Sequence, residues 1–146
     1  MKKLFVVSMI LSSMAVLCYA QEGLDMGEVT DSLKEKTEMV LMQAAKSDVE
    51  MTIPMGLDLY FIDNGAYPST QQGLIALVVK PDSAQNWNGP YLRSEKKLKD
   101  PWGNQYIYKH PYDETDGYIV YSFGPDGKEE TKDDLVFKSS EVVPGQ

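Results

Sequence analysis

The chain has 146 residues, 42% of them hydrophobic, which is enough for one domain with an apolar core. Its formal net charge of −8 argues against nucleic acid as a partner, because phosphate binding needs clustered Lys and Arg side chains. The single cysteine, Cys18, excludes an internal disulfide, and the single histidine, His110, excludes a zinc site built from several histidines.

The first 20 residues have the features of a Sec-type signal peptide. Lys2-Lys3 form a basic start, residues 4–17 form an apolar run, and Cys18-Tyr19-Ala20 ends in a small residue. Residues 4–20 are short for a membrane-spanning helix, so cleavage after Ala20 is predicted. The chain would then be exported to the periplasm or the cell exterior. A retained inner-membrane anchor is the alternative.

A helical pattern follows over residues 21–64. Pro54 lacks a backbone N–H and its ring clashes one turn back, so a kink or break is predicted near residues 50–53. Asn64-Gly65 can end the helix in a left-handed cap. The apolar residues that recur at helical spacing are Val29, Leu33, Val40, Leu41, Ala44, Ala45, Val49, Ile53, Leu57, Tyr60 and Phe61.

A second, short helix is predicted next. Ser69 and Gln72 have the spacing of a capping box, residues 73–79 supply an apolar body, and Lys80-Pro81 ends it. In the turn-rich segment after it, Trp87 and Trp102 are expected to pack into a small core rather than to form a platform for sugars.

Three candidate strands complete the chain: residues 105–110, 117–123 and 135–138. Tyr106, Tyr108, Tyr118 and Val120 alternate with other residues as in a half-buried antiparallel sheet. The predicted fold class is therefore α+β. A long N-terminal helix and a short second helix precede a small three-stranded antiparallel sheet.

The segment that joins the last two strands is strongly acidic. It carries two lysines, Lys128 and Lys132, and five carboxylates, which are Asp126, Glu129, Glu130, Asp133 and Asp134. Such crowding is unfavourable unless water or a cation screens the charges, and carboxylate and carbonyl oxygens are the ligands that calcium prefers. A solvated loop and a calcium site both stay open, and the spacing is not that of an EF-hand.

No enzyme motif is present. The sequence lacks a Gly-x-Ser-x-Gly elbow, a phosphate-binding loop and a His-Glu-x-x-His pair, and cleavage would remove the only cysteine. A carboxylate pair of the glycosidase kind is not favoured on a hydrated loop. We therefore expect no catalytic residue, no organic cofactor and no enzymatic activity.

Several blocks in consecutive order resemble the head domain of the major pseudopilin, the G subunit, of type II secretion systems. The blocks are Leu57-Asp58-Leu59-Tyr60, residues 63–70, Gln72-Gly73-Leu74, residues 87–92, residues 99–104 and residues 122–127. The resemblance implies a structural or assembly protein of the protein secretion apparatus. Its partners would be other pseudopilin or secretion-apparatus proteins, including copies of itself.

The resemblance also implies one structural calcium ion in the last loop. Carried over by position, Asp126 and Asp133 would give side-chain oxygens and Phe123 a backbone carbonyl, with Asp134 as a further ligand. Glu129 and Glu130 stand where the family often has glycine.

The predicted organisation is a signal peptide (1–20), a helical lead (21–53), a pseudopilin-G-like domain (54–140) and a flexible tail (141–146). The N-terminus departs from the family pattern, in which a leader ending in Gly precedes a long apolar helix with an early Glu. An alternative therefore stays open: a free exported calcium-binding module that reuses the pseudopilin head fold with another partner.

Overall fold

The computed structural model describes residues 26–112 and 117–139. The predicted signal peptide and tail lie outside these ranges, and the predicted domain boundaries stay predictions. Two compact units are present, residues 1–40 and 41–146. The described part of the first unit is helical, and all other described elements belong to the second. Among the described helices, none combines the length and the apolar character that a membrane span requires.

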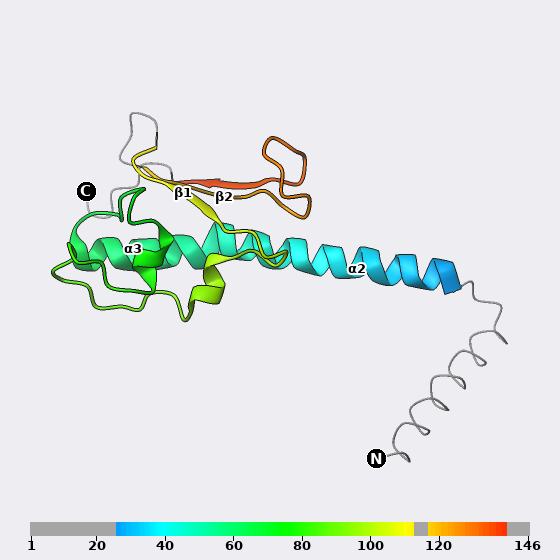
Figure 1. Cartoon of the computed structure of the whole chain (residues 1–146), viewed down its shortest axis with the longest axis horizontal. Coiled ribbons are helices and arrows are strands. Elements are labelled where there is room, and N and C mark those ends of the chain that lie inside the picture. The colour runs from blue at the N-terminus through cyan, green and yellow to red at the C-terminus, as the bar shows by residue number, and fades with distance from the viewer. Residues whose placement is uncertain (1–25, 113–116, 140–146) are drawn as a thin grey trace, which may run out of the picture. The chain divides into compact units, whose positions relative to one another are not determined.

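The predicted long helix is present and is interrupted just before Pro54 (Figure 1). It consists of α2 (Met26–Ser47), a π-helical turn η1 (Asp48–Thr52) and α3 (Ile53–Asn64). In the π turn, the N–H of Ile53 donates to the carbonyl of Asp48, five residues back. The wide turn makes room for the proline ring, which has no N–H to donate.

The end of α3 is also as predicted. Gly65 adopts a left-handed conformation with φ 77°, and its N–H donates to the carbonyl of Phe61 at 2.7 Å. This is the glycine C-cap expected from the sequence.

The second helix is shorter than predicted. The capping box forms, because the N–H of Ser69 donates to Gln72 Oε1 (2.7 Å) and the N–H of Gln72 donates to Ser69 Oγ (3.2 Å). Gly73 then adopts φ 61° and ψ −174°, far from helical values, so the turn cannot continue as an α-helix. Only a 3₁₀ helix, η2 (Leu74–Leu77), follows, and the predicted extent through residue 79 is wrong.

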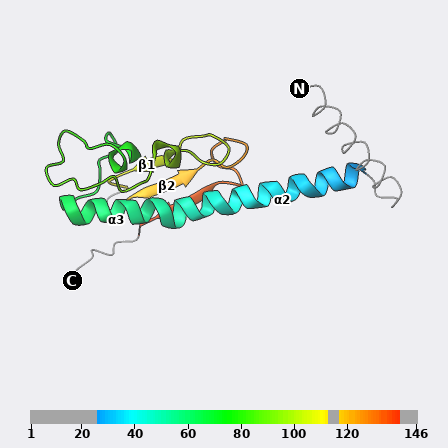
Figure 2. The ribbon, with the colours of Figure 1, turned by 90° about the horizontal axis from the view of Figure 1, so that it is seen from below.

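Three strands form one antiparallel sheet in the order β1-β2-β3. They are β1 (Ile107–Lys109), β2 (Ile119–Ser122) and β3 (Leu135–Lys138). In the register, Val120 lies opposite Tyr108 on one side and Phe137 on the other. The views in Figure 1 and Figure 2 agree that β1 and β2 lie on one side of the helical segment formed by η1 and α3. Strands β2 and β3 contact η1, and η2 contacts α3.

The core lies between the helical segment and the sheet. Ile53, Leu57 and Leu77 are fully buried, and the four residues predicted to alternate in the sheet, Tyr106, Tyr108, Tyr118 and Val120, are buried with them. The hydroxyl of Tyr108 donates to the carbonyl of Pro68 at 2.7 Å. Burial raises the pKa of Tyr108, so this hydroxyl keeps its proton.

Two polar contacts fasten the loops to this core. Trp87 packs on it as predicted, and its Nε1 donates to the carbonyl of Ala76 at 2.8 Å. Trp102 is half-buried but is not in the core cluster formed by the described residues. Asp48 on η1 is buried, and Lys97 Nζ donates to its two oxygens at 2.9 and 3.0 Å. Lys97 belongs to a second 3₁₀ helix, η3 (Glu95–Leu98), which is thereby tied to η1.

Two leucines on α3 test this core. Leu57 is fully buried and Leu59 is 45% exposed, so the same truncation removes core contacts at only one of them. We expect Leu57→Ala to lower the free energy of unfolding by about 2–5 kcal/mol. Leu59→Ala should change it by about 0.5 kcal/mol or less. Urea denaturation of the purified chain measures both, and equal losses would contradict the described orientation of α3.

Candidate functional site

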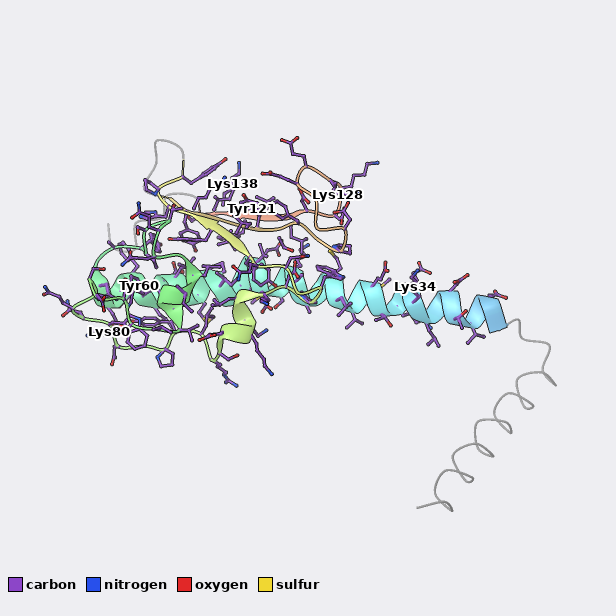
Figure 3. The ribbon with its side chains drawn as sticks, viewed as in Figure 1. Lys34, Tyr60, Lys80, Tyr121, Lys128 and Lys138 are labelled. Carbon is purple, nitrogen blue, oxygen red and sulfur yellow. The ribbon has the colours of Figure 1, made fainter. Side chains whose placement is uncertain are left out.

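The acidic loop, residues 123–134, leaves β2 and returns to β3. Figure 1 shows it as the orange segment, and Figure 3 labels Lys128 on it and Tyr121 on the strand that enters it. Gly124 and Gly127 adopt φ of 65° and 64°, and Glu130 adopts φ of 65°. A left-handed conformation costs a non-glycine residue about 1–2 kcal/mol. The loop therefore makes a turn that suits glycine at a position where this chain has glutamate.

Asp134 supports this unfavourable turn. Its Oδ2 accepts hydrogen bonds from the N–H groups of Glu130 (2.8 Å) and Thr131 (3.3 Å). Its Oδ1 accepts from Thr131 Oγ1 at 3.1 Å. Asp134 thus holds the backbone at the point where the loop is most strained, and Oδ1 is the less committed of its two oxygens.

Asp126 and Asp133 lie beside each other in the same loop. Asp133 Oδ2 accepts from the N–H of Asp126 at 3.4 Å, and Asp126 Oδ1 accepts from the N–H of Lys128 at 2.9 Å. A Cβ on Gly124 would lie 2.6 Å from both the carbonyl oxygen and Oδ2 of Asp133, so those oxygens press against the glycine. A hydrogen bond from Thr131 holds the pKa of Asp133 below its ordinary value, which favours the ionised form.

The residues that the sequence singled out lie in one loop, and their role as ligands stays a prediction. Asp133 lies against Gly124, the neighbour of Phe123, and the single hydroxyl hydrogen of Thr131 has Asp134 Oδ1 (3.1 Å) and Asp126 Oδ1 (3.4 Å) as alternative acceptors. Across residues 26–112 and 117–139, no three His, Cys, Asp or Glu side chains converge as a metal-holding group. A cation here would need backbone carbonyls beside the carboxylates, and that mixed oxygen set suits calcium.

Sequence reasoning missed how the start of the loop is held. The N–H of Gly124 donates to Ser122 Oγ at 3.1 Å, and Asn104 Nδ2 donates to the carbonyl of Gly124 at 3.3 Å. Asn104 lies 20 residues away in the sequence, so this contact depends on tertiary structure. The only local signal is the turn chemistry of Asp100-Pro101-Trp102-Gly103-Asn104.

Sequence reasoning also missed an exposed apolar stripe along η1 and α3. It consists of Met51, Met55, Leu59 and Ile62, whose side chains are 45% to 68% exposed. The first three border a shallow groove of about 460 Å³, which Tyr91, Leu92 and Arg93 also line. The spacing of three and four residues places the stripe on one helical face, opposite the buried Ile53 and Leu57.

Comparison with known proteins identifies relatives over most of the chain. The model of the family described as "Type II secretion system (T2SS), protein G" matches residues 32–138. The type II secretion system core protein G of Pseudomonas aeruginosa is 44% identical over 111 residues, covering 69% of this chain and 71% of that protein. The protein of the same name from Escherichia coli K12 is 38% identical over 111 residues, covering 73% and 74%.

A solved structure supports the same relationship. The crystal structure of the major pseudopilin from the type 2 secretion system of enterohaemorrhagic Escherichia coli matches with a TM-score of 0.57 and 35% identity. The match covers 71% of this chain and 91% of that one. The resemblance and the α+β pseudopilin fold predicted from the sequence are confirmed. The chain belongs to the protein G family of type II secretion systems, the family of the major pseudopilin.

Proposed function

We propose that this chain is a non-enzymatic structural subunit that assembles with other pseudopilin or secretion-apparatus proteins, including copies of itself. Family membership supports a place in a secretion system. The observation that carries the assembly role is the apolar stripe on η1 and α3. Burying apolar surface is favourable by about 25 cal/mol per Å². An assembly in which a neighbouring subunit covers the stripe is therefore stabilised.

A second copy of the chain suits this surface. Met51 and Met55 have flexible thioether side chains that adapt to irregular partners. Arg93 at the groove is exposed and forms no ion pair among the described residues. The chain as a whole carries a net charge of −8, so a carboxylate of a second copy that pairs with this guanidinium would offset part of the repulsion between two negatively charged copies.

We propose further that the acidic loop holds one calcium ion. Its ligands would be the carbonyl of Phe123 and side-chain oxygens of Asp126, Asp133 and Asp134. The donor chemistry, the ionised state of Asp133 and the crowding of five carboxylates against two lysines support this assignment. The ion would lower the electrostatic repulsion between the carboxylates, and it would link the start of the loop at Phe123 to its end at Asp133 and Asp134.

We place the protein in the exported space, periplasmic or extracellular, with residues 1–20 removed. The intact mass of the protein purified from its native host measures this directly. We expect a species that begins at Gln21. A membrane-bound species that retains residues 4–20 would instead support the inner-membrane anchor.

A charged substitution in the stripe tests assembly. We expect Met55→Glu to reduce co-sedimentation of the protein with the secretion-apparatus assemblies of its host and to reduce secretion, because a carboxylate would have to be buried at the contact. Val136→Glu is the matched control, since Val136 is 51% exposed on β3 and lies outside the stripe. Assembly of Met55→Glu at the wild-type level would contradict the assigned surface. A wild-type protein that is always monomeric would favour the free exported module.

Loop substitutions test the ion. Calcium at a hundredfold excess over its Kd would stabilise the fold by about 2.7 kcal/mol. Thermal melting should therefore show a higher Tm in calcium than in chelator for the wild type. Asp126→Ala and Asp133→Ala should lose most of this difference. Glu129→Ala removes a carboxylate from the same loop without removing a proposed ligand, and it should keep the difference. Equal melting of the wild type in calcium and chelator would refute the site.

A further inference from the structure

A buried carboxylate lies behind the start of the acidic loop. Asp100 is 5% exposed, and it forms no ion pair with another described residue. Its Oδ1 accepts from the N–H groups of Trp102 (3.1 Å) and Asn104 (2.8 Å). Its Oδ2 accepts from Ser122 Oγ (2.7 Å) and Asn104 Nδ2 (3.4 Å). Four donors thus converge on two carboxylate oxygens.

These donors specify a carboxylate at position 100. An asparagine has one oxygen and one NH₂ group. Its NH₂ group would face two of the four donors, and it could not accept a hydrogen bond from either. A buried carboxylate without a cationic partner is costly to keep, and hydrogen bonds offset only part of that cost. Its presence therefore points to a positional role rather than to a simple gain in stability.

Two of the four donor groups, Ser122 Oγ and Asn104 Nδ2, also form hydrogen bonds with Gly124. Ser122 Oγ donates to Asp100 and therefore presents a lone pair to the N–H of Gly124 at 3.1 Å. Asn104 Nδ2 contacts Asp100 and donates to the carbonyl of Gly124 at 3.3 Å. The peptide groups before and after Gly124 are both fixed in this way.

The orientation of the first peptide group matters for the ion. In a planar trans peptide the N–H and the preceding C=O point in opposite directions. When Ser122 fixes the N–H of Gly124, it also fixes the direction of the Phe123 carbonyl, which is a proposed calcium ligand. Asp100 in turn fixes the hydroxyl of Ser122.

We propose that Asp100 is a positioning residue for calcium binding, which acts through Ser122 and Asn104 to preset the Phe123 carbonyl and the start of the acidic loop. This inference rests on the calcium site proposed above. Groups that orient metal ligands typically change metal affinity by about 10–100-fold when they are replaced. The hydrogen bonds of Asp100 described above go to Trp102, Asn104 and Ser122 and to none of the proposed ligands, so Asp100 is a positioning residue and not a ligand.

Calorimetric titration of calcium into the purified full chain tests the proposal, at a temperature below the Tm of every variant. We expect Asp100→Asn to raise the Kd by about 10–100-fold. Ser122→Ala should also raise the calcium Kd, because this substitution removes the hydroxyl that fixes the N–H of Gly124. Ser122→Ala removes only one oxygen atom, and its calcium Kd tests the proposal if Asp100→Asn does not fold.

Asp48→Asn is the matched control. Asp48 is also a buried carboxylate, 7% exposed, but its partners are Lys97 and Tyr106 and not the loop. It should lower the Tm in chelator and leave the calcium Kd unchanged, which separates positioning from a general loss of stability. Wild-type affinity in folded Asp100→Asn and Ser122→Ala would overturn the proposal. A wild type that binds no calcium would instead overturn the calcium site itself.

Discussion

One face of α3 and of the π turn before it is buried beneath the tyrosines of the sheet, and the other elements depend on that contact. Ile53 and Leu57 supply the helical side of the core, and Tyr108 on β1 and Tyr118 just before β2 supply the other side. The same periodicity that turns these residues inward turns Met55 and the rest of the stripe outward. A single helical segment thus builds the core with one face and exposes the apolar stripe on the other.

The acidic loop is held at both ends by hydrogen bonds that do not involve a metal. At its start, the network of Asp100 fixes Gly124, and near its end Asp134 supports the left-handed Glu130. Between these supports the loop is exposed and carries most of its negative charge. Such a loop can be ordered by an ion at little conformational cost, because its backbone path is already largely set.

Local chemistry explains which parts of the fold were predictable. The glycine cap at Gly65, the capping box at Ser69 and the alternation around Tyr108 each involve residues close in the sequence. The conformation of Gly73 shortened the second helix, and nothing in its neighbours indicates that value of φ. The hydrogen bond from Ser122 to Asp100 joins residues 22 positions apart, so it depends on tertiary structure. The exposure of the stripe depends in the same way on which face of the helix the sheet covers. The four calcium ligands were inferred from the resemblance and stay a prediction.

The two methionines of the stripe have a chemical consequence of their own. Met51 and Met55 are each 62% exposed, so their sulfur atoms are open to oxidants in the surrounding solution. Conversion of a thioether to a sulfoxide adds a polar oxygen but leaves the buried face of the helix untouched. At the assembly surface proposed above, oxidation would therefore weaken association while the fold persists. A copy already covered by its neighbour would be shielded, so damage would fall on subunits that have not yet been incorporated.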